Sequence, residues 1–167
     1  AVNVIGQSNF TSSANATTQA GLNTPQGLAY DEVGQRLFVG QAGASRVTVY
    51  DVSTITNGEN AVNVLGQSSF TAVVTITSQS GMSNCRGLAY DAAGQRLFVA
   101  DYNNNRVIVF DVASISNGEN AINVLGQSAY TAGNSAATTT QSGMSMPYGL
   151  AYDAPHNRLY VAQYDGN

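Results

Sequence analysis

The feature that most constrains this chain is an internal repeat whose copies begin at Ala1, Ala61 and Ala121. A block that reads AVNVIG at residues 1–6 returns as AVNVLG at 61–66 and as AINVLG at 121–126. Repetition at a fixed period of this length is typical of proteins that stack one structural unit on copies of itself. The 167 residues therefore predict one repeat domain, 1–167, with repeats at 1–60, 61–120 and 121–167.

Three further blocks recur in step with the first. GLAYD begins at Gly27, Gly87 and Gly149, RLFV or RLYV at Arg36, Arg96 and Arg158, and RV-x-V at Arg46 and Arg106. The step from Gly87 to Gly149 is longer by two positions than the step from Gly27 to Gly87, which predicts a two-residue insertion in the loop after Thr131. Each block is short, alternating, and rich in β-branched and aromatic residues, so each predicts a strand.

Both faces of the predicted strands are apolar. In Arg106–Asp111, Val107 and Val109 point to one side while Ile108 and Phe110 point to the other. Such a strand must be covered on both sides, and a sheet placed between two copies of itself meets that requirement. Four strands in each full repeat, with no helical period, predict the blades of an all-β β-propeller. A β-helix would have shorter coils, and a β-sandwich does not repeat in sequence.

The strand count predicts a partial propeller. One leading outer strand, two whole four-stranded blades and the two inner strands of a third make eleven strands, or about three blades. So few blades cannot close a ring, because known rings need roughly four or more. We therefore expect further blades on at least one side of residues 1–167, or blades supplied by neighbouring copies of the chain.

Glycine and asparagine mark the turns between the strands. Gly34 and Gly94 lie in the tight link between GLAYD and RLFV, where we expect a positive φ. The third repeat has His156 at that position, and histidine tolerates left-handed backbone better than most residues. Asn-Gly pairs at 57–58 and 117–118 predict the turn before the AVNVLG strand.

Taken together, the blocks resemble the NHL repeat. The segments that carry the likeness are Pro25–Asp31, Arg96–Asp101 and Asn104–Phe110, and the similarity covers nearly the whole chain. The NVLGQ-x-x-Phe/Tyr-Thr segment is similar to that of long-repeat bacterial NHL proteins. The resemblance implies a propeller that most often has about six blades. Members of the family include adhesion and scaffold modules, RNA-binding domains and a lyase that cleaves peptidyl-hydroxyglycine, so the fold leaves the function open.

Several positions depart from the family pattern. Cys85 stands where the motif has proline, and Gln41 and Gln163 stand where the second repeat has Asp101. The sequence AGAS at 42–45 replaces the asparagine-rich turn of the second repeat. The resemblance therefore gives no support to a role that needs the acidic residue in every blade.

Composition limits the classes of function. Charged residues make up only 10% of the chain, the net charge is −4, and all six basic residues are arginine. Nucleic-acid binding requires a basic patch that this sequence lacks. No apolar run approaches the roughly 20 residues of a membrane helix. A low content of charge and a high content of Asn, Ser and Thr favour an extracellular or cell-surface protein.

The sequence contains no recognisable active site. His156 is the only histidine and Cys85 the only cysteine, and no cluster of His, Cys, Asp and Glu indicates a metal site. We interpret His156 as a turn residue and Cys85 as a small residue packed beside a strand. Residues 101–105 lack the spacing and the closing glutamate of a calcium loop, so we expect a hairpin turn there. We expect neither a cofactor nor a metal.

Arginine recurs with the fold. Arg36, Arg96 and Arg158 occupy one repeat position, and Arg46 and Arg106 occupy another. Repetition in step with the strands indicates a structural role. We expect these guanidinium groups to bridge carbonyl oxygens, or to pair with Asp51 and Asp111 between strands.

A small set of positions varies while its neighbours repeat. The residue before GLAYD is Gln26, Arg86 and Tyr148 in turn, and the pair after the RLFV strand is Gln41-Ala42, Asp101-Tyr102 and Gln163-Tyr164. The family resemblance implies that these positions lie near the entrance of the central channel. Aromatic faces, amides and one arginine suit recognition of a protein or a glycan. Ordinary drift at exposed sites is the alternative. The candidate binding residues are Gln26, Arg86, Tyr148, Gln41, Asp101, Tyr102, Gln163 and Tyr164.

These observations favour a non-enzymatic, extracellular NHL-type propeller scaffold. Its partner would be a protein or glycan ligand, or neighbouring copies of the chain in a surface assembly. The alternative is a fragment of a propeller enzyme, a lyase or a lactonase, whose catalytic residues lie outside these 167 residues.

Overall fold

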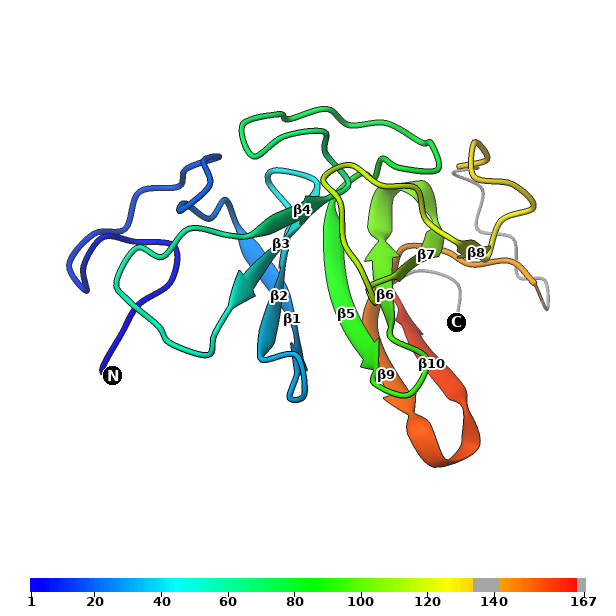
Figure 1. Cartoon of the computed structure of the whole chain (residues 1–167). Coiled ribbons are helices and arrows are strands. Elements are labelled where there is room, and N and C mark those ends of the chain that lie inside the picture. Colours follow the sequence, from blue (N-terminus) through cyan, green and yellow to red (C-terminus); the bar gives the residue numbers. More distant parts are fainter. Residues whose placement is uncertain (134–141, 165–167) are drawn as a thin grey trace.

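The computed structural model, which describes residues 1–133 and 142–164, contains three antiparallel sheets that stand side by side like blades of a fan (Figure 1). The first sheet has the order β1 (Pro25–Asp31), β2 (Arg36–Gln41), β3 (Arg46–Asp51) and β4 (Asn63–Leu65). The second has β5 (Cys85–Asp91), β6 (Arg96–Asp101), β7 (Arg106–Asp111) and β8 (Asn123–Leu125). The third pairs β9 (Pro147–Asp153) with β10 (Arg158–Gln163). The fold is therefore a partial β-propeller.

Helical structure in the described part of the chain is limited to two short turns. These are the 3-10 turns η1 (Tyr102–Asn104) and η2 (Ala154–His156). The first confirms the predicted hairpin turn after Asp101. Within residues 1–133 and 142–164, no helix has the length and apolar character needed to cross a membrane. The loop with the predicted insertion after Thr131 lies partly outside the described residues.

Each repeated block forms the predicted strand, except the leading copy at 1–6. There, Gly6 makes only an isolated bridge with Gly21. The physical reason is the pairing of the outer strands: β4 binds β3 and β8 binds β7, and the described residues offer no such partner to residues 1–6. The expectation of eleven strands is corrected to ten in the described part of the chain.

Each Asn-Gly turn forms hydrogen bonds with the outer segment that begins the same repeat unit, one turn with Val4 and the other with Val64. The side-chain oxygen of Asn117 accepts the Val64 N–H at 3.0 Å, and the Gly118 N–H donates to the Val64 carbonyl at 3.1 Å. Asn57 and Gly58 hold Val4 in the same way. Both glycines have the left-handed backbone that these turns require, with φ of 68° and 69°. The predicted turns are confirmed.

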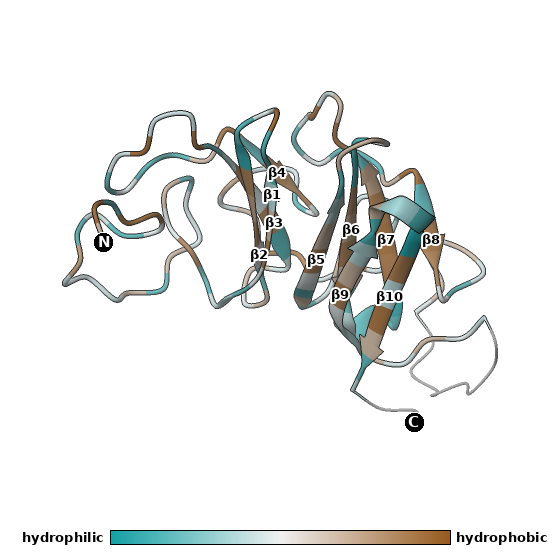
Figure 2. Cartoon of the chain, turned by 90° about the horizontal axis from the view of Figure 1, so that it is seen from below, coloured by the Kyte–Doolittle hydropathy of each residue, from teal (hydrophilic) through white to brown (hydrophobic). Residues whose placement is uncertain are grey.

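The apolar core lies between the sheets. Ile108 and Phe110 pack toward the first sheet with Phe38, while Val107 and Val109 pack toward the third sheet. Figure 2 shows brown stretches within strands such as β7 and β10, with teal toward the strand ends. The two-faced strand predicted at Arg106–Asp111 is therefore covered on both sides.

The hairpin glycines have a role different from the one predicted. Neither Gly34 nor Gly94 has a positive φ; the left-handed residue is the next one, Gln35 at 48° and Gln95 at 49°. A Cβ on Gly94 would lie 2.4 Å from the Asp91 carboxylate and 2.7 Å from Arg96 Nε. Glycine is therefore needed to make room for an ion pair.

That ion pair also corrects the predicted partners of one arginine class. Arg36 binds Asp31 and Arg96 binds Asp91, each at 2.6 Å, whereas Asp51 and Asp111 accept backbone N–H groups two residues ahead. Both kinds of aspartate lie opposite the arginine in register, one across the hairpin and one across the next ladder, so register alone does not select the partner. Asp31 and Asp91 are buried, whereas Asp51 and Asp111 are exposed.

The third repeat departs from this pairing. With His156 in the glycine position, its Nδ1 contacts the Asp153 carboxylate at 2.8 Å. In the described part of the chain Arg158 makes no ion pair with Asp153. The aspartate contacts the histidine instead of the arginine. His156 lies in the turn as predicted, but the left-handed residue is Asn157, with a φ of 51°, and not His156.

Candidate functional site

Antiparallel pairing brings the varied positions to one edge of the molecule. The first residue of each inner strand faces the last residue of the second strand, as in Cys85 opposite Asp101. The residue before GLAYD in one repeat therefore lies beside the residues that follow RLFV. This geometry explains why two separate sets of positions form one surface.

Arg86 and three tyrosines form a cluster at this edge. The guanidinium carbon lies over the rings of Tyr102 and Tyr148, 5.0 and 5.5 Å from their centroids. Tyr102 makes edge contacts with Tyr148 and Tyr164, each with 6.3 Å between centroids. We call Arg86, Tyr102, Tyr148 and Tyr164 the Arg–Tyr cluster. Cation–π contacts of this kind stabilise the arginine charge.

A cavity of about 250 Å³ opens beside the cluster. Three consecutive residues from the start of each inner strand line it: Gln26-Gly27-Leu28, Arg86-Gly87-Leu88 and Tyr148-Gly149-Leu150. Gln26 and Tyr148 are exposed, with Tyr148 at 46%. Arg86 is the one charged residue among the described lining residues. The predicted residues Gln26, Arg86 and Tyr148 are therefore brought together.

Arg86 has donors that no described residue uses. Its Nε is buried without a hydrogen-bond partner in the described part of the chain. Arg106, by contrast, donates to Asp101 and to three backbone carbonyls. A buried unsatisfied donor costs free energy, but Arg46 also has an unpaired Nε while its other nitrogens bind backbone carbonyls. What distinguishes Arg86 from Arg46 is that none of its guanidinium nitrogens makes a hydrogen bond to a described residue.

Gln41, Asp101 and Gln163 have structural contacts instead. Each accepts a backbone N–H from the loop before its inner strand: Asn23 at 2.8 Å, Ser83 at 2.6 Å and Ser145 at 2.5 Å. Gln41 and Asp101 are fully buried. Burial corrects their assignment as ligand contacts, since neither side chain reaches the surface; Gln163 is exposed, but its acceptor holds the loop.

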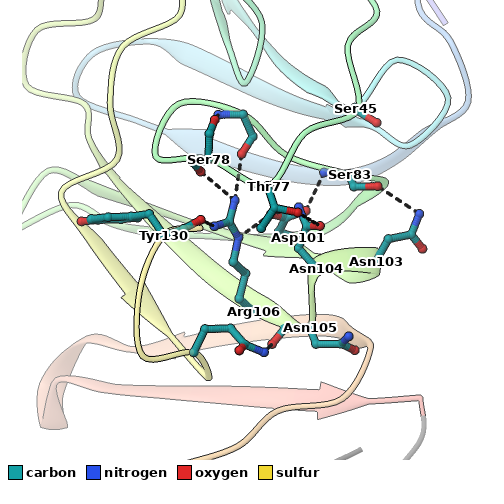
Figure 3. Close-up of polar contacts among 12 residues, drawn as sticks. Ser45, Thr77, Ser78, Ser83, Asp101, Asn103, Asn104, Asn105, Arg106 and Tyr130 are labelled. Atoms are coloured by element: carbon teal, nitrogen blue, oxygen red, sulfur yellow. Dashed lines mark hydrogen bonds and ion pairs between the residues drawn. The ribbon is translucent and has the colours of Figure 1, made fainter. Parts of the chain in front are cut away.

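Asp101 also anchors the Arg106 network (Figure 3). Arg106 Nε donates to its carboxylate at 2.7 Å, and Asn104 donates to the same oxygen at 2.8 Å. Arg106 also reaches the carbonyls of Ser78, Gly81 and Tyr130. In the first sheet Arg46 binds the equivalent carbonyls of Thr18, Gly21 and Phe70. The prediction that arginine bridges carbonyls is confirmed for this class.

The two residues most often associated with chemistry have packed or peripheral positions. Cys85 is fully buried, and burial raises the pKa of its thiol, so the reactive thiolate is disfavoured. This confirms its predicted packing role. His156 is exposed beside Asp153 in the turn between β9 and β10, and its one described side-chain contact is with Asp153 and not with the Arg–Tyr cluster. Within the described residues, no group of three or more His, Cys, Asp or Glu is placed to hold a metal ion.

Some residues of the site escaped the sequence argument. Leu28, Leu88 and Leu150 line the cavity together with the varied positions. They occur in every repeat, so a search for positions that differ between repeats passes over them. The sequence signal that could have identified them is the glycine that precedes each leucine in GLAYD, because glycine in a strand permits neighbouring strands to approach closely.

Comparisons with known proteins agree with the propeller assignment. The sequence profile of the NHL repeat matches residues 82–110. No curated protein matches the sequence. Solved structures with a similar fold include Kuenenia stuttgartiensis hydrazine synthase, at a TM-score of 0.56 and 15% identity, over 93% of this chain and 32% of that one.

Two further structures share the fold. The β-propeller domain of Myceliophteria thermophila Cps50 (Swd1) has a TM-score of 0.52 and 15% identity, over 93% of this chain and 36% of that one. A chain of a nidogen/laminin complex has a TM-score of 0.52 and 16% identity, over 90% and 44%. The chain thus spans about a third to under half of these structures, and likeness at this identity concerns the fold alone. Residues 82–110 match the NHL repeat, and the chain as a whole has the fold of a partial β-propeller.

Proposed function

We propose that this chain is a non-enzymatic, extracellular NHL-type propeller scaffold that binds a protein or glycan ligand at the Arg–Tyr cluster. The observation that carries the proposal is the convergence of positions that break the repeat. Arg86, Tyr102, Tyr148 and Tyr164 come from two sheets and meet at one edge, beside Gln26.

The chemistry of these residues supports recognition. Tyrosine and arginine dominate the energetically important positions of protein interfaces, because they combine large contact area with hydrogen bonding. Tyr148 and Tyr164 are 46% and 69% exposed, so their rings are accessible to a partner. The Nε of Arg86 is buried, so the donors open to a ligand are its two Nη groups, which make no hydrogen bond to a described residue.

The extracellular location rests on composition. Charged residues are 10% of the chain, and Asn, Ser and Thr supply much of its polarity. Surface assembly with neighbouring copies is a second mode of partnership, and it is supported by the exposed blade faces at Leu28 and Tyr160.

Glycan and peptide arrays test the proposal. We expect the wild-type chain to bind one or more ligands, and expect Arg86→Ala and Tyr148→Ala to reduce that signal at least about tenfold with the melting temperature unchanged. Arg158→Ala is the matched control, because Arg158 is an exposed arginine far from the cavity lining. Equal loss in all three variants, or a ligand released in chemically altered form, would contradict a non-enzymatic binding site here.

A further inference from the structure

We propose that Arg86 is the receptor for a carboxylate, and that the cavity beside it takes a hexuronate unit of an acidic polysaccharide. The inference rests on the proposed function, because it names the ligand class of the same site. It starts from the state of the Arg86 side chain.

The tyrosines attract the charge of Arg86 but do not satisfy its hydrogen bonds. The Tyr102 and Tyr148 rings lie 5.0 and 5.5 Å from the guanidinium carbon. A ring face attracts the positive charge without accepting all five N–H groups. In the described part of the chain, Nε is buried with no acceptor, and the two Nη groups, which are not among the buried unpaired atoms, have no hydrogen-bond acceptor either. The Nη groups are therefore the donors that a bound anion would use.

The surroundings favour a negative ligand. Arg86 is the one charged residue among the described residues that line the cavity. Two carboxylates adjoin the cluster in sequence. Asp101, next to Tyr102, is fully buried and bound to Arg106 at 2.7 Å, so its charge is compensated. Asp165, next to Tyr164, lies outside the described residues. The described residues that line the cavity therefore carry a positive charge.

A single arginine fits a carboxylate better than a phosphate. The planar guanidinium presents two parallel N–H groups that match the two oxygens of a carboxylate. A phosphate monoester carries nearly two charges, and sites for it usually gather several cations or backbone N–H groups. Here one cation faces the cavity, and one negative charge balances it.

The rest of the cavity favours a sugar as the carrier of that carboxylate. The aromatic residues of the cluster are all tyrosines, which offer a flat face to a pyranose ring and a hydroxyl for hydrogen bonding. The amide of Gln26 lies across the same cavity and can donate or accept. The volume of about 250 Å³ lies just below the range of roughly 300–1,000 Å³ for drug-sized ligands, so it suits a single sugar unit.

Isothermal titration calorimetry with oligouronates tests the inference. The probes are the trimers of galacturonate and glucuronate, and the same trimers as methyl esters, which keep the shape but lose the charge. We expect at least one acid trimer to bind, and its ester to bind at least about tenfold more weakly. Arg86→Gln should reduce binding of the acid to the level of the ester. Arg158→Gln should change neither.

Three results would overturn the inference. The first is no binding of either acid trimer, the second is an ester that binds as well as its acid, and the third is an Arg86→Gln variant with unchanged affinity. A tri-glutamate peptide that binds more tightly than both trimers would overturn the sugar assignment. The proposed function fails separately: if a neutral ligand from the arrays depends on Arg86, the binding site stands and only its carboxylate preference is wrong.

Discussion

The ion pair between the GLAYD aspartate and the arginine two residues beyond the hairpin glycine depends on the absence of one side-chain atom. Burial opposes ionisation of Asp91, but hydrogen bonds from Arg96 and the Gly94 N–H, with the Arg96 charge, outweigh it and lower its pKa. The pair therefore stabilises the fold at neutral pH. In the third repeat, where His156 occupies the glycine position, the aspartate contacts the histidine ring and the ion pair with arginine is absent from the described residues.

We predict that Gly94→Ala lowers the free energy of unfolding by about 1–2 kcal/mol at pH 7, because the added Cβ displaces the Asp91 carboxylate from Arg96. The lowered pKa of Asp91 contributes stability above about pH 4, its unfolded-state value, and that contribution disappears as the pH falls through the folded-state pKa. The difference between variant and wild type should therefore narrow below pH 4 in urea titrations.

A double-mutant cycle controls for backbone effects. In an Asp91→Asn background Gly94→Ala should cost clearly less, since the ion pair is already absent. If the destabilisations caused by the two substitutions are additive, Gly94 is required by the backbone and not by the ion pair between Asp91 and Arg96.

The first sheet contains an arginine without a carboxylate. Arg46 is fully buried, its Nε has no partner in the described part of the chain, and burial lowers its pKa. In the second sheet the equivalent Arg106 binds Asp101 through Nε. We predict that Gln41→Asp raises the melting temperature by a few degrees at pH 7, because it gives Arg46 the same counterion.

Differential scanning calorimetry provides the comparison, with Gln163→Asp as the control variant, because no arginine of this class follows it in the described residues. A melting temperature that falls in Gln41→Asp, or an equal rise in both variants, would show that the carboxylate does not serve Arg46.

At this scale the sequence predicted which positions gather at one edge better than which of their side chains face that edge. The positions that vary between repeats predicted the edge, and five of eight residues reach it. The other three, Gln41, Asp101 and Gln163, hold the neighbouring loop instead. An amide or a carboxylate at a strand end can either bind a ligand or hold a loop, so the residue type does not distinguish the two roles. The contact of Arg86 with both tyrosines also depends on three-dimensional spacing that the sequence leaves open.

The sequence predicted strands and turns more accurately than it predicted the roles of single side chains. Most of these elements occur in more than one repeat, so the same pattern can be recognised more than once. The leading segment at 1–6 is the exception, and its failure to form a strand has a non-local cause: the edge partner present for β4 and β8 is missing. Local pattern predicts strand tendency, whereas pairing decides whether a strand forms.

The inner strands approach one another so closely that glycine is required between them. A Cβ on Gly87 of β5 would lie 2.4 Å from the Tyr148 carbonyl oxygen and 3.0 Å from the Leu150 nitrogen. Both atoms belong to the backbone of β9 and cannot move without shifting that strand. At Gly149 the nearest atom is 3.6 Å away, an ordinary contact distance.

We therefore predict that Gly87→Ala lowers the free energy of unfolding by about 2 kcal/mol or more, while Gly149→Ala changes it by less than about 0.5 kcal/mol. Chemical denaturation of the two variants measures both values. Equal effects at the two positions would mean that the approach of β5 to β9 does not limit the packing.

Across the whole molecule, the two end sheets each expose a face that is buried in the middle. Leu28 and Tyr30 of the first sheet are 64% and 53% exposed, whereas Leu88 at the equivalent position of the second sheet is 6% exposed. Tyr160 of the third sheet is 54% exposed, and its equivalent Phe98 is 6% exposed. The same two kinds of face pack against each other between neighbouring sheets inside the molecule. Phe38 of the first sheet contacts Tyr90 of the second, and Phe98 of the second sheet contacts Tyr152 of the third.

We predict that the chain associates with itself in solution through these faces. Light scattering should give a mass well above 17.4 kDa, and the double variant Leu28→Gln, Tyr160→Gln should shift it toward the monomer. A wild-type chain that is monodisperse at 17.4 kDa would contradict the prediction.

Arg46 and Arg106 bind backbone carbonyls within their sheets, whereas we propose that Arg86 binds a ligand. The melting temperatures of Arg86→Met and Arg106→Met test this difference directly. Arg106 is fully buried against Asp101, so its removal should cost about 3–5 kcal/mol and lower the melting temperature by roughly 10 °C. Arg86→Met removes a buried Nε with no described partner and retains the packing, so its melting temperature should stay within about 2 °C of wild type or rise. A fall in Arg86→Met as large as that in Arg106→Met would show that Arg86 is structural and would contradict the binding site.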